Sequence, residues 1–165
     1  MAFTNTQTAL RSIGGLTVQR LSQGLKESNS DASGELDQSI SFKIRSSSKK
    51  IELNITMLDY WGAVDEGRKA GKQPPIDKIK EWLTYPNVRD KIRFGQNDSE
   101  FSDSERNSLA YLIARKIGKQ GTKGTNFATN VFESSLITKE LPEVLTDAIV
   151  EDADLVLSEL LSKFD

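Results

Sequence analysis

Apolar residues at helical spacing mark the first segment of the chain. Residues 4–26 are predicted to form an amphipathic helix. Its apolar stripe consists of Leu10, Ile13, Leu21 and Leu25, is interrupted by Thr17, and is flanked by Leu16 and Val18. Gly14 and Gly15 each weaken an isolated helix by about 1 kcal/mol relative to Ala. This helix is therefore expected to need packing against other elements.

Two short segments then alternate apolar and polar positions, the pattern of half-buried strands. The apolar positions are Ile40, Phe42 and Ile44 in the first segment and Ile51, Leu53, Ile55 and Met57 in the second. The turn-like stretch "RSSSKK" separates them, so the pattern predicts a β-hairpin over about residues 38–58. We expect Ile40, Phe42, Ile44, Leu53 and Ile55 to be buried. A hairpin alone is marginally stable, and Tyr60 to Val64 is a candidate third strand.

The remaining pattern is mostly helical. Residues 76–86 form a predicted short helix with Pro75 near its start and with Ile76, Ile79, Trp82 and Leu83 on one face. Residues 87–101 are expected to be mostly loop. Residues 102–120 give the clearest helix, with Ser102 and Glu105, or Ser104, as its cap. Its apolar stripe is Leu109, Leu112, Ile113 and Ile117.

Two further segments complete the chain. Residues 126–136 are expected to form a short helix or turn, and residues 141–164 a long helix with Pro142 in its first turn. The stripe of this last helix is Leu145, Ile149, Val156, Leu160 and Phe164. Helices segregated from one antiparallel sheet define an α+β fold. We expect one domain over residues 1–165, with 1–136 as its core and 137–165 as an acidic C-terminal helix.

Composition removes several kinds of chemistry. The chain has no cysteine and no histidine, which excludes disulfides, thiolate catalysis, Cys/His zinc sites and Ser–His pairs. The carboxylates Asp65 and Glu66 show no catalytic spacing, so we expect no enzyme, no cofactor and no metal. No apolar run approaches the roughly 18 residues of a membrane span. We expect a protein made in the cytoplasm, without a membrane partner.

Charge is distributed unevenly around a net charge of −2. Residues 61–123 hold 13 basic and 9 acidic residues, whereas residues 124–165 hold 2 basic and 9 acidic residues. This asymmetry suits complementary contacts, either within one molecule or between copies. It equally fits two solvated faces of one domain.

The stretch "IARKIGKQGTKGTNFATNVFESSL", Ile113 to Leu136, raises the question of a phosphate site. Its glycines lack the spacing of a nucleotide-binding P-loop and follow a helix instead of a strand. Two basic groups are compatible with a nucleic-acid patch: Arg115, Lys116, Lys119 and Lys123, and Arg68, Lys69 and Lys72. The alternative is a glycine-terminated helix with a solvated basic end.

Two stretches together resemble the tail-completion, or head–tail joining, proteins of the neck of tailed bacteriophages. The first, "VDEGRKAGKQPPIDKIKEWL", is similar to that family's "EGRKPGKxPP" turn followed by a helix with a Trp, here Trp82. The second, "LAYLIARKIGKQGTKGTNFATNVFES", is similar to the family's "FxIARxIxxxGTK" helix and aromatic segment. The resemblance covers residues 60–134. The chain departs from the family pattern at two places. Gly124-Thr125 stands where the family has a proline or basic residue, and Ala128 stands where the family has a second aromatic residue.

The resemblance implies a structural virion protein and not an enzyme. Such proteins form homo-oligomeric rings, commonly hexamers, that complete the tail and join it to the head connector. The implied partners are portal-side adaptor proteins, tail tube or hub proteins, and DNA only as the passing genome. The alternative is a nucleic-acid or host-factor binding module that uses the basic middle segment.

The same resemblance implies that both motifs lie close together near a subunit boundary. Phe127, Phe132 and the apolar stripe of the C-terminal helix are the expected apolar anchors, and the basic groups are expected to face acidic partners, including the 140–159 helix of an adjacent copy. The implied contact residues are Arg68, Lys69, Lys72, Pro74, Pro75, Trp82, Arg115, Lys116, Lys119, Thr122, Lys123, Asn126, Phe127 and Phe132.

Overall fold

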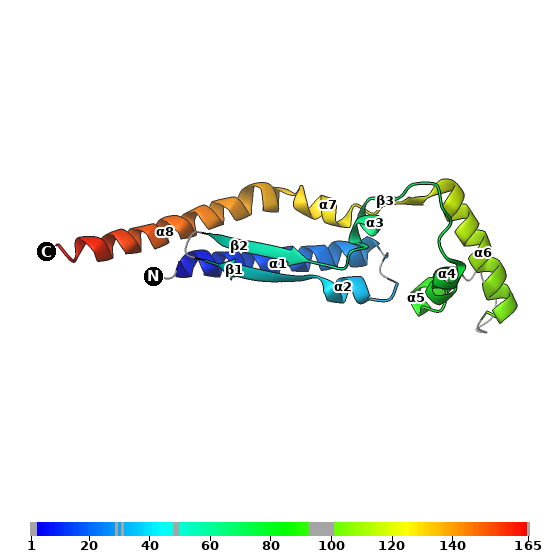
Figure 1. Cartoon of the computed structure of the whole chain (residues 1–165). Helices are drawn as coiled ribbons and strands as arrows, with labels where there is room; N and C mark the ends of the chain where they lie inside the picture. The colour runs from blue at the N-terminus through cyan, green and yellow to red at the C-terminus, as the bar shows by residue number, and fades with distance from the viewer. Residues whose placement is uncertain (1–2, 29, 31, 48–49, 93–100, 165) are drawn as a thin grey trace.

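The structure, a computed structural model, describes residues 3–28, 30, 32–47, 50–92 and 101–164. It is an elongated α+β molecule, which confirms the predicted fold class (Figure 1). A long first helix, α1 (Thr4–Ser28), lies beside an antiparallel hairpin of β1 (Ser41–Ser46) and β2 (Ile51–Thr56). Among the described residues, no helix combines the length and the apolarity that crossing a membrane requires.

Helix α1 is the central element of the larger part of the molecule. It packs against the hairpin, against α7 (Phe127–Phe132) and against the C-terminal helix α8 (Leu141–Leu161). Its predicted stripe is confirmed, because Leu10, Ile13, Leu21 and Leu25 are buried. Thr17, in the middle of the stripe, is buried too, and its hydroxyl donates to the Ile13 carbonyl oxygen at 2.8 Å. The polar interruption is thus satisfied within the helix.

The hairpin lies within the predicted residues 38–58. Phe42 pairs with Ile55 and Ile44 with Leu53, so these four side chains share one face. Ile40 is buried, whereas the four paired residues are only half-buried. The hairpin approaches α1 at Gly14, where a Cβ atom would lie within 2.7 Å of the Phe42 ring carbon Cγ. Gly14 therefore supplies the space in which the hairpin meets the helix.

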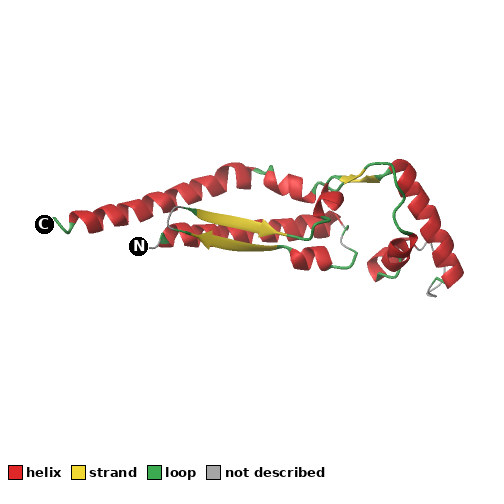
Figure 2. Cartoon of the chain, in the orientation of Figure 1, coloured by secondary structure: helices red, strands yellow, loops and turns green. Residues whose placement is uncertain are grey.

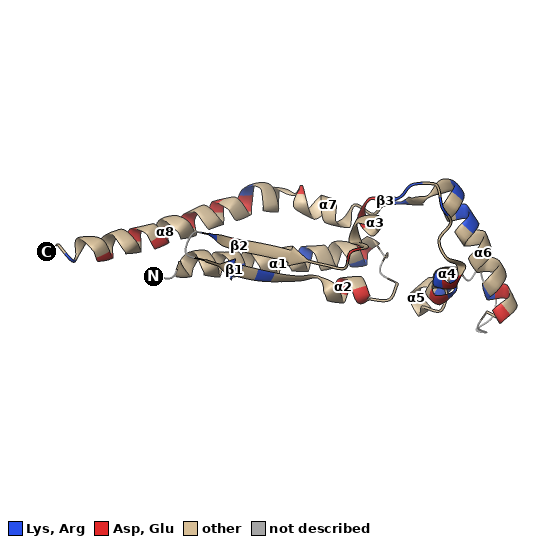
Figure 3. Ribbon diagram, in the orientation of Figure 1, with Lys and Arg blue, Asp and Glu red and all other residues tan. Residues whose placement is uncertain are grey.

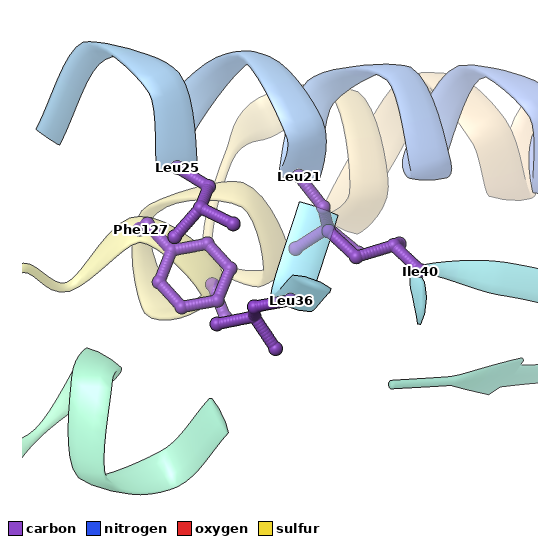
Figure 4. Packing of buried hydrophobic residues seen from close by; sticks show 6 residues of the cluster. Leu21, Leu25, Leu36, Ile40 and Phe127 are labelled. Carbon is purple, nitrogen blue, oxygen red and sulfur yellow. The ribbon is translucent and has the colours of Figure 1, made fainter. Parts of the chain in front are cut away.

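The main hydrophobic cluster lies where α1, α7 and the short helix α2 (Glu35–Ser39) meet (Figure 4). Leu21 and Leu25 from α1 point toward Leu36, Ile40 and Phe127. The half-buried residues Val18, Ile55, Met57, Trp61, Val64 and Val131 surround this cluster. Phe127, only 2% exposed, is thus part of the core of the chain itself.

Two local predictions were wrong. Residues 61–65 form a short helix, α3 (Trp61–Asp65), and not a third strand. The reason is that Trp61 and Val64, three residues apart, both pack on the main cluster, as a helical turn allows. The predicted loop contains helix α5 (Pro86–Ile92), with Val88 and Ile92 four residues apart on a second cluster. The rest of that predicted loop, residues 93–100, lies outside the described residues.

Residues 69–121, of which 93–100 are not described, form a unit that we call the arm. It contains α4 (Ile76–Trp82), α5 and α6 (Asp103–Gln120) (Figure 2). The buried residues Leu83, Val88 and Ala110 form its core. The predicted capping box of α6 is confirmed, since Ser102 accepts from the Glu105 N–H and Glu105 accepts from the Ser102 N–H. The predicted apolar stripe of α6 was wrong at Leu112, which is 58% exposed.

A π-helical segment, η1 (Leu136–Glu140), leads into α8. Helix α8 places Leu141, Ala148 and Asp152 in buried positions, with Leu145 and Val156 half-buried. The predicted α8 stripe is therefore only partly correct. Ile149, Leu160 and Phe164 are exposed on a different face. The side of α8 that faces α1 consists of residues 141, 145, 148, 152 and 156. Residue 152 is an aspartate, so the apolar pattern alone did not identify this face.

That carboxylate, Asp152, caps the start of α1. Its Oδ1 accepts from the Asn5 N–H at 3.0 Å, and its Oδ2 accepts from the Thr6 N–H at 2.8 Å and the Thr6 hydroxyl at 2.7 Å. The first N–H groups of a helix have no partner within the helix, so these bonds satisfy donors that would otherwise be orphaned. Burial raises the pKa of the Asp152 carboxyl, but the bonds from Thr6 and Asn5 outweigh burial and lower it overall.

Gly14 and Gly15 give a matched test of the packing of α1. Gly15→Ala is expected to raise the free energy of unfolding by about 0.5–1 kcal/mol, because nothing lies near its Cβ position and Ala favours the helix. Gly14→Ala is expected to lower it by about 1–3 kcal/mol through overlap with the Phe42 ring. Urea unfolding of both variants measures this. Equal effects at the two positions would contradict the packing described here.

Asp152 gives a pH-dependent test. Its lowered pKa means that it stabilises the fold above the unfolded-state pKa of about 3.9, and that this stabilisation is lost as the pH falls through the folded-state pKa. Asp152→Asn is therefore expected to be less stable than the unmodified chain at pH 7, with the difference narrowing below about pH 4. Urea unfolding across this range measures it. The exposed neighbour Asp154→Asn is the control, and a matching effect there would refute the cap.

Candidate functional site at a glycine-rich junction

The arm joins the rest of the chain through two short paired strands. β3 (Gly67–Arg68) precedes the arm and β4 (Thr122–Lys123) follows it, and the two pair antiparallel. Gly67 lies opposite Lys123, and Arg68 lies opposite Thr122. We call this region, residues 65–73 with 118–126, the junction. The predicted proximity of the two sequence motifs is confirmed, whereas their place at a subunit boundary stays a prediction.

Glycine is required where the two strands meet. Gly67 and Gly121 have φ angles of 83° and 73°, in the left-handed region that other residues rarely adopt. A Cβ on Gly67 would also clash with the Thr122 carbonyl oxygen, and one on Gly121 with the Arg68 carbonyl oxygen. Gly124 is restricted in a similar way by the Asp65 carbonyl oxygen. The two backbone segments therefore lie so close together that no residue with a side chain fits at these three glycine positions.

Further hydrogen bonds fix the turn that leads from β3 into the arm. The Gly71 N–H donates to the Gly118 carbonyl oxygen at 2.8 Å, which ties the turn to the last part of α6. Within the turn, Arg68 Nη2 donates to the Lys72 carbonyl oxygen at 2.6 Å. The Arg68 N–H also donates to the Thr122 hydroxyl at 3.1 Å. The turn is thus held by both of the segments it connects.

Asp65, at the end of α3, anchors the other side of the junction. It is 2% exposed, and its Oδ1 accepts from the Ala128 N–H at 2.7 Å while its Oδ2 accepts from the Thr129 hydroxyl at 2.6 Å. Its own carbonyl oxygen accepts from the Asn126 N–H at 2.9 Å. The carboxylate therefore caps the first turn of α7 across more than sixty residues of sequence. The neighbouring Glu66 is exposed.

Five residues of the two basic groups lie in the junction, and Arg115 and Lys116 lie in the part of α6 that directly precedes it. The exposed residues are Arg68, Lys69, Lys72, Arg115, Lys116, Lys119 and Lys123. Figure 3 shows basic positions along the connection at β3 and the adjoining end of α6, and acidic positions along α8. None of these seven side chains forms an ion pair with another described residue. The junction therefore presents uncompensated positive charge on a backbone that its hydrogen bonds hold in place.

The other predicted contact residues are distributed as follows. Pro74 is half-buried and Pro75 is exposed at the start of α4, while Thr122 is exposed in β4. Asn126 is exposed and adopts the left-handed conformation, with φ of 54°, before α7. Trp82, at the end of α4, and Phe132, at the end of α7, are partly exposed at 37% and 38%. These two rings remain accessible to a partner, but they lie outside the junction.

Phe127 requires a correction. The sequence motif suggested a contact anchor, but the side chain is buried between α1 and α2 (Figure 4). The physical reason is the Asp65 cap, which fixes the start of α7 and places its first residue against Leu21 and Leu25. Truncation of Phe127 would remove core packing worth about 3–5 kcal/mol, so it would report on folding and not on a contact.

Sequence reasoning missed two structural carboxylates. Asp65 was weighed only as a catalytic candidate, although the polar pair Thr125-Asn126 before Phe127 signals a helix start that needs a cap. Asp152 sits four residues after Ala148, on the buried face of α8. A charged residue within such a spacing indicates a buried partner. In the part of the chain that the structure describes, no cluster of three or more His, Cys, Asp or Glu residues is arranged to hold a metal ion.

The junction combines two closely approaching backbone segments, a helix start capped by a buried carboxylate, and exposed positive charge. The first two features hold the backbone in place, and the positive charge is suited to contact with an acidic or polyanionic surface. Comparison with family models, with curated proteins and with solved structures finds no match to this chain.

The Asp65 cap gives a test of the junction. Asp65→Ala is expected to lower the free energy of unfolding by about 1–3 kcal/mol, because it leaves buried N–H donors of α7 unpaired. It should also speed trypsin cleavage after Lys123 in the native protein. Glu66→Ala, one residue away and exposed, is the matched control and should change neither measurement. An Asp65→Ala variant as stable as this control would refute the role of the cap.

Proposed function

We propose that this chain is a structural protein of tailed bacteriophage particles, forming a ring at the neck or top of the tail that joins the tail to the head connector. The observation that carries the proposal is the pairing of β3 with β4. The two motifs that resemble the tail-completion family are 54 residues apart at Arg68 and Thr122, yet they form one backbone ladder. Motifs that meet in space are expected to serve one site.

The geometry of the junction supports a contact role. Its backbone is fixed by the ladder and by the bonds at Gly71 and Asp65, so a partner that binds there orders little additional chain. The seven basic side chains in and beside it are exposed and form no ion pair with other described residues. In such a contact, charge mainly sets orientation and association rate, and exposed ion pairs contribute only about 0–1 kcal/mol each. Partly exposed rings such as Trp82 and Phe132 are candidates for the apolar contribution.

A nucleic-acid binding module is the second candidate, favoured by the same cluster of basic side chains. Binding to DNA through this cluster would release counterions, so its affinity would fall steeply with salt. In the proposed ring the genome only passes through the lumen, and the purified chain would bind DNA weakly. Titration of a DNA duplex with the purified chain at two salt concentrations distinguishes the structural ring protein from the nucleic-acid binding module, because only the second predicts tight, salt-dependent binding.

A deletion experiment tests the proposed function. Removal of the coding sequence from the phage genome that carries it is expected to leave DNA-filled heads and finished tails that are not joined, as seen by electron microscopy. The chain supplied from a plasmid should restore joining. Native mass spectrometry of the purified protein is expected to show a closed ring, with six copies as the family resemblance implies. Normally joined particles without the chain would refute the proposal.

Matched variants test the role of the junction in the same assay. Lys69→Glu combined with Lys72→Glu reverses two exposed charges of the turn and should prevent plasmid rescue. Lys43→Glu combined with Arg45→Glu makes the same change in net charge on the exposed positions of β1 and should permit it. Rescue by both double variants would show that the turn is not a contact site.

A further inference from the structure

Helix α8 carries a second apolar face that the fold leaves uncovered. Val150, Ala153, Leu157 and Leu160 follow one another at spacings of three and four residues, which places them along one side of the helix, and Phe164 follows in the turn after its end. We call this set the outer stripe. All five are exposed, Leu157 by 56% and Phe164 by 87%. The α1-facing residues of α8, such as Ala148 and Asp152, lie on a different side.

Acidic residues accompany the outer stripe. Asp147, Glu151 and Asp154 are exposed on one flank of it and form no ion pair with other described residues. Two α8 helices joined through their outer stripes would offer these carboxylates no unpaired cation, because the opposite flank holds Ile149 and Val156 at the corresponding heptad positions and its Lys163 pairs with Glu159. Charge therefore favours a partner helix that is basic beside its own apolar residues.

The chain itself contains such a helix. On α6, Ala110 and Ala114 face the core of the arm, while Tyr111 and Leu112 are 49% and 58% exposed. Arg115, Lys116 and Lys119 follow them, also exposed and without an ion pair among the described residues. This outer face of α6 combines large apolar side chains with positive charge. It is the complement of the outer stripe and its acidic flank.

The two faces cannot meet within one molecule. Helix α6 lies at one end of the elongated chain, and the C-terminal half of α8 lies at the other (Figure 1). We propose that the outer stripe of α8 in one copy binds the outer face of α6 in the next copy. Such a contact uses two different surfaces, so each copy keeps one free face of each kind, and the contacts repeat until they close into a ring or extend as a filament. This inference rests on the proposed function only for closure into a ring.

Crosslinking tests the pairing of α8 with α6 directly. Because the chain contains no native cysteine, a maleimide crosslinker reacts only at the introduced cysteines. Leu112→Cys and Leu157→Cys are prepared as separate variants, each at an exposed position, and circular dichroism verifies that both fold. A short bis-maleimide should link them efficiently when they are mixed, and poorly when either is alone. Leu16→Cys, exposed on α1, replaces Leu157→Cys in the control mixture and should give no link to Leu112→Cys.

Charge exchange provides the second test. Arg115→Glu with Lys119→Glu is expected to weaken self-association by at least about tenfold, measured by analytical ultracentrifugation. Adding Asp147→Lys and Asp154→Lys in the same chain should restore it. Leu157→Ser with Leu160→Ser should weaken it to a similar degree without loss of stability, since both side chains are exposed in the single chain. Leu16→Ser with Leu58→Ser is the matched control.

The outcomes separate this inference from the proposed function. A link between two Leu157→Cys chains, with none in the mixture, would replace it with an α8–α8 contact. A closed ring that survives the Leu157→Ser and Leu160→Ser changes would overturn it and leave the proposed function standing. A chain that remains monomeric at all concentrations would overturn it as well. A mixed crosslink in a chain absent from phage particles would support the inference and refute the proposed function.

Discussion

The close approach of two backbones at Gly67 and Gly121 is the constraint on which the rest of the structure depends. At this point the chain leaves the body formed by α1, the hairpin, α7 and α8, and at the same point it returns. A side chain at either glycine would force the strands apart, because the opposing atoms are carbonyl oxygens of the backbone. This crossing sets the direction in which the arm leaves the body, and the adjoining Asp65 cap sets the start of α7.

Two buried carboxylates then hold the helices to one another. Asp65 reaches from α3 to the start of α7, and Asp152 reaches from α8 to the start of α1. Each satisfies N–H groups at a helix start that the helix cannot satisfy itself, and each does so from a distant part of the sequence. Capping is ordinarily a local interaction that defines where a helix begins. Here it also fixes how separate elements pack, with a directionality that hydrophobic contacts lack.

The sequence predicted well whatever depends on local periodicity. The helices predicted at residues 4–26, 76–86, 102–120 and 141–164, the hairpin and the capping box at Ser102 all follow from spacing, although the structure shifts the helix ends by a few residues. It failed where tertiary contacts decide, as at α3, where Trp61 and Val64 turn toward the main cluster. The resemblance predicted that the two glycine-rich motifs lie close together, but not the strand pairing that joins them. That Phe127 is core and Phe132 partly exposed depends on the Asp65 cap, which no local pattern reveals.

The pairing of β3 with β4 also determines how the chain tolerates change in length. The chain enters the arm at β3 and leaves it at β4, and these two strands are paired. For the body, residues 69–121 are therefore equivalent to a single loop whose ends are held together. Loop-closure entropy grows slowly, by about 0.6 kcal/mol for each doubling of length. Lengthening or shortening the helices of the arm would therefore disturb the body little, provided that the glycines at its base and the packing of Ala32 on the core of the arm remain. The surface that the arm presents can therefore change without a new fold of the body.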